Sequence, residues 1–217
     1  MEIQKWASRY INDSGMLLIE QAVKSAESKT SGEIVPIVVK CSSAIGRVYS
    51  ELMQLSLLFV VIAYIFSSTY FFVSILNALI IVCLVVSVLL SFYLSKLDFV
   101  QRIFTNPFDR EKQVNMRAEV EFFEAKLSKT RARTGILLFC SLMEQRAVVL
   151  ADKAISEKLP QDTWNEVLNL IIEGMKQGDI AKGYVQAIER CGEILASHFP
   201  IEPDDTNELN DGLILKV

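Results

Sequence analysis

A run of 44 consecutive residues with no charged or histidine side chain, from Leu52 to Ser95, constrains this chain more than any other feature. Thirty-four of these residues are apolar, and ten are Gln, Ser, Thr or Asn. All 48 charged residues lie among the other 173 residues, a proportion typical of globular proteins. The positive mean hydropathy of the chain, +0.32, therefore comes from one segment.

The length of this uncharged run fits two membrane-spanning helices. A helix needs about 20 apolar residues to cross the hydrocarbon core, so the run is too long for one crossing. We predict spans over Leu52–Tyr70 and Phe72–Leu94, with a turn between Ser67 and Asn77. The alternative is a helical hairpin buried in a soluble core, which the rest of a chain of 217 residues is too small to cover.

Basic residues flank the run on both sides. They are Lys40 and Arg47 before it, and Lys96, Arg102, Arg110, Lys112 and Arg117 after it. Because basic flanks stay in the cytoplasm, we expect an integral protein of a bacterial-type inner membrane with both termini cytoplasmic. The lipid bilayer is then its first partner.

Helix and strand patterns alternate on either side of the run. Before it, we expect a helix that starts with Asp13 or Ser14 as N-cap, and a strand over 33–39 in which Pro36 indicates an edge or a bulge. After it, we expect helices over 96–104, 115–127, 163–177 and 180–198, and strands over 134–140 and 147–151 that form an antiparallel hairpin. A last edge strand is expected at 213–215.

Two of these helices carry more specific expectations. Met116, Val120, Phe123 and Leu127 recur at helical spacing and predict one face of a helix. Thr163 and Glu166 have capping-box spacing, with Asp162 as the alternative cap. Trp164, Val167, Leu168, Ile171 and Met175 form the inward stripe of that helix, which Gly178 ends.

One strand precedes the run and at least two follow it. A single strand cannot bury its own faces, so we expect both halves to form one small sheet with packed helices. The predicted fold is an α/β sandwich interrupted by a two-helix transmembrane hairpin. Its parts are residues 1–51, the hairpin at 52–95, and residues 96–217 with an acidic C-terminal tail.

Several functional classes are excluded or disfavoured by composition. A net charge of −4 and a pI near 5.2 exclude a basic nucleic-acid binder. His198 is the one histidine, and the four cysteines (Cys41, Cys83, Cys140 and Cys191) show no metal-binding spacing, so we expect buried, reduced thiols. No phosphate-binding glycine loop or serine-hydrolase motif occurs.

The best polar constellation lies at the ends of the predicted strands. It consists of Glu33, Glu144, Arg146 and Asp152, which Asp13 could join from the first helix. Asp152, Glu144 and Arg146 are candidate catalytic residues. Asp13, Glu33 and Asp152 are candidate ligands for a metal ion, Ca²⁺ or Mg²⁺. Ordinary capping and ion pairing is the alternative role for all of them.

The segments Lys29–Val35 and Arg133–Arg146, in this order, resemble the TPM-domain family. The tail Pro203–Leu209 is similar to that of bacterial membrane members of this family. The resemblance implies a compact α/β sandwich and, in some members, phosphatase activity or calcium binding. Phosphatase-like members carry a glycine-rich segment after the third strand, where this chain has Ala151–Ser156.

Two functions remain open at this point. The first is a non-catalytic, membrane-anchored interaction or regulatory module that binds another membrane protein or a second copy of itself. The second is a phosphatase assisted by a divalent metal ion. The missing catalytic motifs and the long apolar hairpin favour the first.

Overall fold

The structure is a computed structural model that describes residues 6–42, 46–67, 73–94, 97, 100, 106–201 and 205–217. It divides into two compact units. Met1–Ser42 and Glu111–Val217 form one of them, which we call the α/β unit. Ser43–Arg110 form the other, which we call the hairpin unit.

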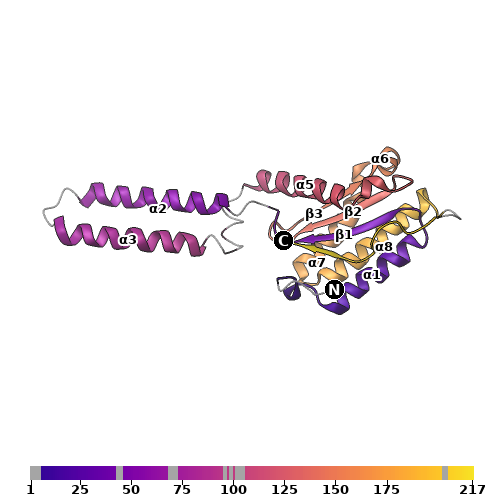
Figure 1. Ribbon diagram of the computed structural model, residues 1–217, viewed down its shortest axis with the longest axis horizontal. Coiled ribbons are helices and arrows are strands. Elements are labelled where there is room, and N and C mark those ends of the chain that lie inside the picture. The colour runs from indigo at the N-terminus through magenta and orange to yellow at the C-terminus, as the bar shows by residue number, and fades with distance from the viewer. Residues whose placement is uncertain are drawn as a thin grey trace. The chain divides into compact units, whose positions relative to one another are not determined.

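The α/β unit is built on a four-stranded sheet with the order β3-β2-β1-β4 (Figure 1). The strands are β1 (Glu33–Val39), β2 (Gly135–Ser141), β3 (Arg146–Ala151) and β4 (Ile214–Lys216). β1 is parallel to β2 and to β4, and β3 is antiparallel to β2. Strands from both sides of the uncharged run therefore share one sheet, and the predicted α/β class with packed helices is confirmed.

Helices cover both faces of this sheet. On one face lie α1 (Asp13–Glu27), α7 (Asn165–Gln177) and α8 (Ile180–His198), whose side chains share a core with Ile34, Ile136 and Val149. On the other face, α5 (Pro107–Glu124) packs its α/β-unit residues against Val35, Leu137 and Phe139. All seven residues of β1 and of β2 are buried, as expected for strands covered on both faces. The short elements are η1 (Ala7–Arg9), η2 (Leu127–Lys129), α6 (Lys153–Lys158) and η3 (Gln161–Trp164).

Pro36 occupies the one stretch of β1 where its missing N–H costs nothing. β4 pairs only with residues 37–39 of β1, so the edge of β1 beside Pro36 has no neighbouring strand. The N–H of Ile34, on the same edge, donates instead to the carboxylate of Glu27 at 2.7 Å. The predicted edge strand or bulge is therefore wrong, because β1 lies between β2 and β4 in a continuous register, and Pro36 is tolerated because β4 does not extend to the edge beside it.

Two predicted helix starts are wrong. The N-cap of α1 is Asn12, whose side chain accepts the N–H of Gly15 at 2.8 Å, and not Asp13 or Ser14. The expected capping box at Thr163 and Glu166 does not form, because residues 161–164 make a 3₁₀ turn and α7 starts at Asn165 without a side-chain cap. The stripe from Trp164 to Ile171 does face the core, and Gly178 ends α7 with a φ of +76°.

The predicted helix is present as α5, and the face defined by its apolar spacing is largely exposed. Met116, Val120 and Phe123 are 56%, 50% and 66% exposed, and among the four predicted residues only Leu127 is buried. The helix instead packs on the sheet through Val114, Ala118, Glu121 and Phe122. Glu121 is tolerated there because its carboxylate binds both Arg117, at 2.8 Å, and the ammonium of Lys216. We call Met116, Val120 and Phe123 the α5 stripe.

The hairpin unit contains α2 (Gly46–Ser67) and α3 (Val73–Leu94). They are antiparallel, since the hydroxyl of Ser91 near the end of α3 reaches the carbonyl of Leu52 near the start of α2. The two helices predicted from the uncharged run are thus present, and the short helix expected over 96–104 lies largely outside the described residues. Within the described residues, no helix combines the length and hydrophobicity that a membrane span requires. The transmembrane assignment stays a prediction.

A close contact between α7 and α8 depends on two glycines. A Cβ placed on Gly183 of α8 would lie 2.8 Å from the Cα of Gly174 in α7, and 2.9 Å from the carbonyl oxygen of Leu170. Both contacts are with backbone, which cannot rotate away. The two helices can therefore approach this closely only with glycine at both positions.

We expect Gly183→Ala to lower the free energy of unfolding of the α/β unit by about 2 kcal/mol or more, because α7 and α8 must separate. Urea unfolding of the purified chain, followed by circular dichroism, measures this loss. Gly212→Ala is the matched control, since its Cβ would meet only the side chain of Asn210. A loss below about 0.5 kcal/mol for Gly183→Ala would contradict the close contact.

Candidate functional site

Glu33 and Asp152 lie at the same end of the sheet. Glu33 opens β1 and pairs with Gly135, the first residue of β2. Asp152 follows β3, and its N–H donates to the carbonyl of Gly135 at 2.8 Å. Two of the predicted site residues therefore flank one backbone position.

Glu33 is a buried carboxylate that is only half satisfied. Glu33 is 7% exposed. One carboxylate oxygen, Oε1, accepts the N–H of Glu208 from the C-terminal tail at 3.1 Å. The other, Oε2, is buried without a hydrogen-bond partner. Burial raises the pKa of Glu33, against the lowering effect of the backbone N–H groups of Glu208 and Leu209.

Glu27 is a partly buried carboxylate with a similar hydrogen-bond arrangement, and it was not among the residues predicted from the sequence. Its Oε1 caps the N–H of Ile34, while Oε2 is buried without a hydrogen-bond partner. Burial raises the pKa of Glu27 to about 8, the bond from Ile34 opposes the shift, and repulsion from Glu33 and Asp211 adds to it. Pro36 was the available signal, because an unpaired strand edge leaves the Ile34 N–H in need of an acceptor.

A pocket of about 240 Å³ lies beside these two carboxylates. Its walls combine acidic, polar and apolar side chains from α1, from β1 and from the tail. They are Lys24, Glu27, Ser28, Thr30, Glu33, Ile201, Asp205 and Asn207. We call this the acidic pocket.

Asp152 has a structural role in the fold. It is the N-cap of α6, and its Oδ1 accepts the N–H of Lys153 at 2.7 Å. Its Oδ2 is buried without a hydrogen-bond partner. The segment after β3 is a short helix fixed by this cap.

Glu144 and Arg146 lie at the opposite end of the sheet, where β1 and β2 end. Glu144 is 3% exposed, and both of its carboxylate oxygens accept the N–H of Ser42 at 3.2 Å. It also accepts a short hydrogen bond from the hydroxyl of Ser141 and a weak one from the thiol of Cys41 at 3.6 Å. Arg146 pairs with Glu111 of α5 at 3.1 Å. Glu144 therefore ties the segment that leaves β1 to the turn that leaves β2.

The structure does not bring the predicted constellation together. β1 separates Glu33 from the Glu144 end by about 20 Å of extended strand. Asp13 is exposed in the first turn of α1, about 21 Å along the helix from Glu27. The predicted metal ligands Asp13, Glu33 and Asp152 are therefore not one site. Among the described residues, no three acidic, thiol or imidazole side chains converge as a metal site.

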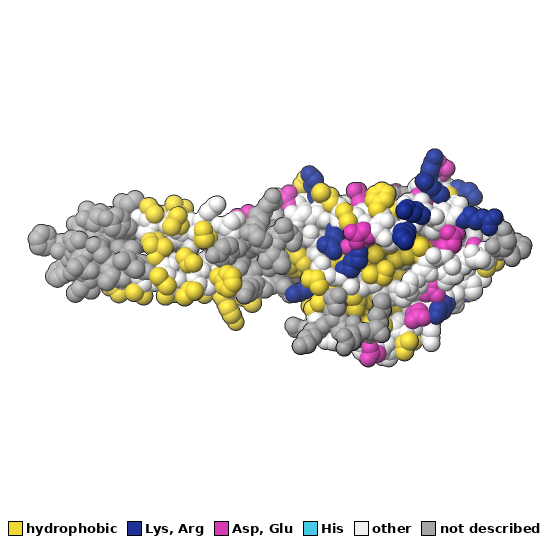
Figure 2. All heavy atoms as spheres, viewed as in Figure 1, with side chains coloured by type: hydrophobic (Ala, Val, Ile, Leu, Met, Phe, Trp, Pro, Cys, Tyr) yellow, Lys and Arg dark blue, Asp and Glu magenta, His cyan; other side chains and the backbone are white. Residues whose placement is uncertain are grey.

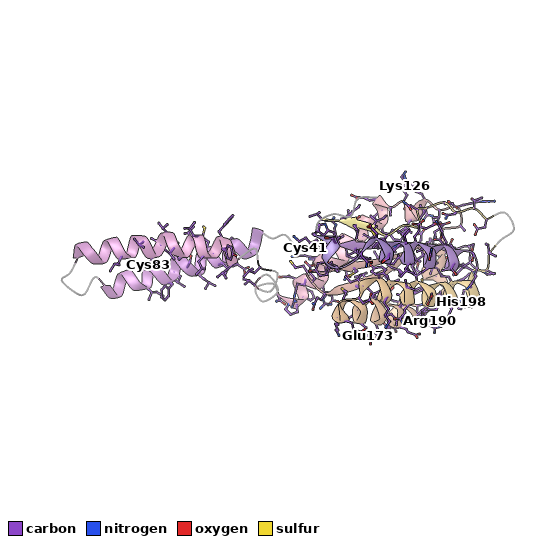
Figure 3. All side chains as sticks on the ribbon, turned by 90° about the horizontal axis from the view of Figure 1, so that it is seen from below. Cys41, Cys83, Lys126, Glu173, Arg190 and His198 are labelled. Carbon is purple, nitrogen blue, oxygen red and sulfur yellow. The ribbon has the colours of Figure 1, made fainter. Side chains whose placement is uncertain are left out.

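His198 and the buried cysteines do not form a catalytic group with the carboxylates at either end of the sheet in the part of the chain that the structure describes. His198 and Cys41 lie at opposite ends of the α/β unit (Figure 3), and Nδ1 of His198 contacts the carbonyl of Ile194. Cys140 and Cys191 are completely buried, and burial raises the pKa of both thiols. These two thiols are therefore inert, as expected for core cysteines.

Residues 99–194 match the family model of the TPM domain. This part of the chain is similar to the TPM domain. The resemblance carried by Arg133–Arg146 is thereby confirmed. The matched segment includes β2, β3 and α7, whereas α1, β1 and β4 lie outside it although they complete the same unit.

The fold of the chain is also similar to that of a solved structure. The NMR structure of the BA42 protein from the psychrophilic bacterium Bizionia argentinensis aligns with a TM-score of 0.58, covering 95% of each chain. The two sequences are 21% identical, so the similarity concerns the fold. No curated protein matches the chain significantly.

We expect the stability of the α/β unit to fall as the pH rises. Glu27 binds its proton more tightly in the folded state than in the unfolded state. Its contribution to the free energy of unfolding is therefore complete below pH 4.5. Between pH 4.5 and about pH 8 this contribution falls, by as much as about 1.4 kcal/mol per pH unit. Urea unfolding at pH 5, 6.5 and 8 in EDTA measures this slope.

Glu27→Gln keeps an oxygen for the Ile34 N–H and removes the ionisation, so we expect it to flatten the slope. Glu173→Gln is the control, because Glu173 is exposed on α7 (Figure 3). If the Glu27→Gln profile runs parallel to the wild-type profile, the assignment of the slope to Glu27 is wrong.

Proposed function

We propose that this chain is a TPM-domain protein that is anchored in a bacterial-type inner membrane by α2 and α3. In this proposal it acts by binding other membrane proteins rather than by catalysis. The function rests on one observation above all, the exposed α5 stripe. The anchoring rests on the uncharged run of the sequence.

Support for the anchor comes from sequence and exposure together. No charged residue occurs from Leu52 to Ser95, part of which lies outside the described residues. Large apolar side chains cover the described surface of the helical pair (Figure 2), among them Phe59, Val82 and Leu89, which are between 58% and 74% exposed. Apolar surface of this kind is stable in lipid or against another apolar surface. The basic flanks favour cytoplasmic termini.

Support for the interaction role comes from the α5 stripe. Met116, Val120 and Phe123 follow the i, i+4, i+7 spacing of one helix face, and that face points away from the sheet. Three such side chains on one exposed ridge are typical of a surface that another protein covers. Their removal would cost the fold little, since the core uses the opposite face of the helix.

A divalent-metal-assisted phosphatase ranks second, because two of its candidate residues have structural roles. Asp152 caps α6, and Glu144 holds the backbone of Ser42. The interaction module is therefore the function that the geometry supports best.

For the anchor, we expect a membrane-impermeant maleimide to modify Cys41 in inverted inner-membrane vesicles and not in intact cells. Cys41 is partly exposed, whereas Cys140 and Cys191 are buried and do not compete. Cys41→Ser identifies the labelled site by mass shift. Labelling in intact cells would place this end outside the cytoplasm, and recovery of the chain in the soluble fraction would contradict the anchor.

For the interaction, we expect a photo-crosslinking amino acid at position 120 to give discrete adducts in native membranes. The same amino acid at position 173, also on an exposed helix face, should give none. A Met116→Gln, Phe123→Gln variant should lose the adducts while its stability changes by no more than about 0.5 kcal/mol per site. Adducts that survive this variant would show that the stripe is not the contact surface.

A further inference from the structure

We propose that the acidic pocket binds the guanidinium group of an arginine side chain from a partner protein. The inference deepens the proposed function in that it names a chemistry by which a partner is recognised. The pocket is separate from the α5 stripe and involves α1, β1 and the tail.

Glu33 is buried and Glu27 is partly buried. Each carboxylate has one oxygen that accepts a backbone N–H and one buried oxygen that receives no hydrogen bond from a donor, and the carboxyl of Asp211 lies against that of Glu27. Leaving a buried acceptor unsatisfied is costly, and the cost is larger for a charged group. Two such groups beside one pocket indicate a ligand that supplies hydrogen-bond donors and positive charge.

The walls of the acidic pocket carry mainly acidic side chains. Asp205 lines it together with Glu27 and Glu33, and Glu208 and Asp211 act on these two carboxylates electrostatically. Lys24 is the basic residue of the wall, but its ammonium is bound by Glu20 at 2.6 Å. The acidic charge of the pocket is therefore not neutralised by its own lysine.

A guanidinium group fits the acidic pocket better than a metal ion does. Three acidic groups do not converge on one point among the described residues, so a tightly coordinated metal ion is disfavoured. A planar guanidinium carries five donors and can pair with two carboxylates that are separated. About 240 Å³ has room for this group and part of its stem, for which Ile201 and Thr30 offer apolar contact.

Binding should be coupled to pH through Glu27. A guanidinium favours the ionised carboxylate, and Glu27 holds its proton up to about pH 8. The groups near it are Glu33 from β1, Lys24 from its own helix, and Asp205 and Asp211 from the tail, while Glu208 acts on Glu33. Binding should therefore release a proton and be tighter at pH 8.5 than at pH 6.

The test measures thermal unfolding of the full chain, purified in mild detergent, with ethylguanidinium chloride added at about 10 mM or less. N-ethylurea is the neutral control of the same shape, and MgCl₂ is a separate arm. We expect ethylguanidinium to raise Tm by roughly 3–6 °C at about ten times its Kd, and N-ethylurea to have no effect. The shift should be larger at pH 8.5 than at pH 6.

Matched variants locate the binding. Glu27→Gln and Glu33→Gln keep the size of the side chain and the acceptor for the backbone N–H, and should abolish the shift. Glu173→Gln should respond as the wild type does. An equal shift in Glu33→Gln, or a larger shift with MgCl₂ than with ethylguanidinium, would overturn the proposal. Crosslinking from position 120 reads the α5 stripe separately, so failure here is distinguishable from failure of the interaction role.

Discussion

The pairing of β1 with β2 is the constraint on which the rest of the structure depends. The seven residue pairs from Glu33 with Gly135 to Val39 with Ser141 join segments about a hundred residues apart. Loop closure over that distance costs conformational entropy, which burial of both strands on both faces repays. The intervening chain must leave and re-enter the sheet, and this is where the hairpin unit is inserted. Glu144, which binds Ser42 and Ser141, fastens the exit of β1 to the exit of β2.

At the other end of this strand pair, where β1 begins, the backbone of β1 lacks a neighbouring strand on one edge among the described residues. β4 covers only three residues of β1, so the edge near Pro36 would be open. The chain closes it with a proline that lacks a donor and with the carboxylate of Glu27. That solution takes the carboxylate of Glu27 partly out of solvent, close to Glu33 and Asp211. Burial raises the pKa of Glu27, and repulsion from Glu33 and Asp211 adds to the rise. The raised pKa is thus a consequence of how the strand edge is capped.

Much of this fold could be predicted from the sequence, because strong periodic signals match what the elements bury. The runs that became β1 and β2 are continuous and apolar, and both strands are buried on both faces. The helix ends at Gly178 and the late edge strand followed from local chemistry in the same way. The site was less predictable, since the constellation of Glu33, Glu144, Arg146 and Asp152 was chosen by chain position. Only the register of the sheet separates these residues into two ends.

The face of α5 that packs on the sheet shows where sequence patterns reach their limit. The helix carries two stripes, one with the large side chains of Met116, Val120 and Phe123, and one with Val114, Ala118, Glu121 and Phe122. Hydrophobic periodicity favours the first, because the second contains a glutamate. That glutamate becomes acceptable only through Arg117 and Lys216, and Lys216 lies 95 residues away in β4. A buried ion pair supplied by a distant strand therefore fixes the orientation of α5, and it leaves the more apolar face exposed. A helix that turns its larger apolar side chains to the outside is poorly explained by the packing of its own domain and well explained by a partner.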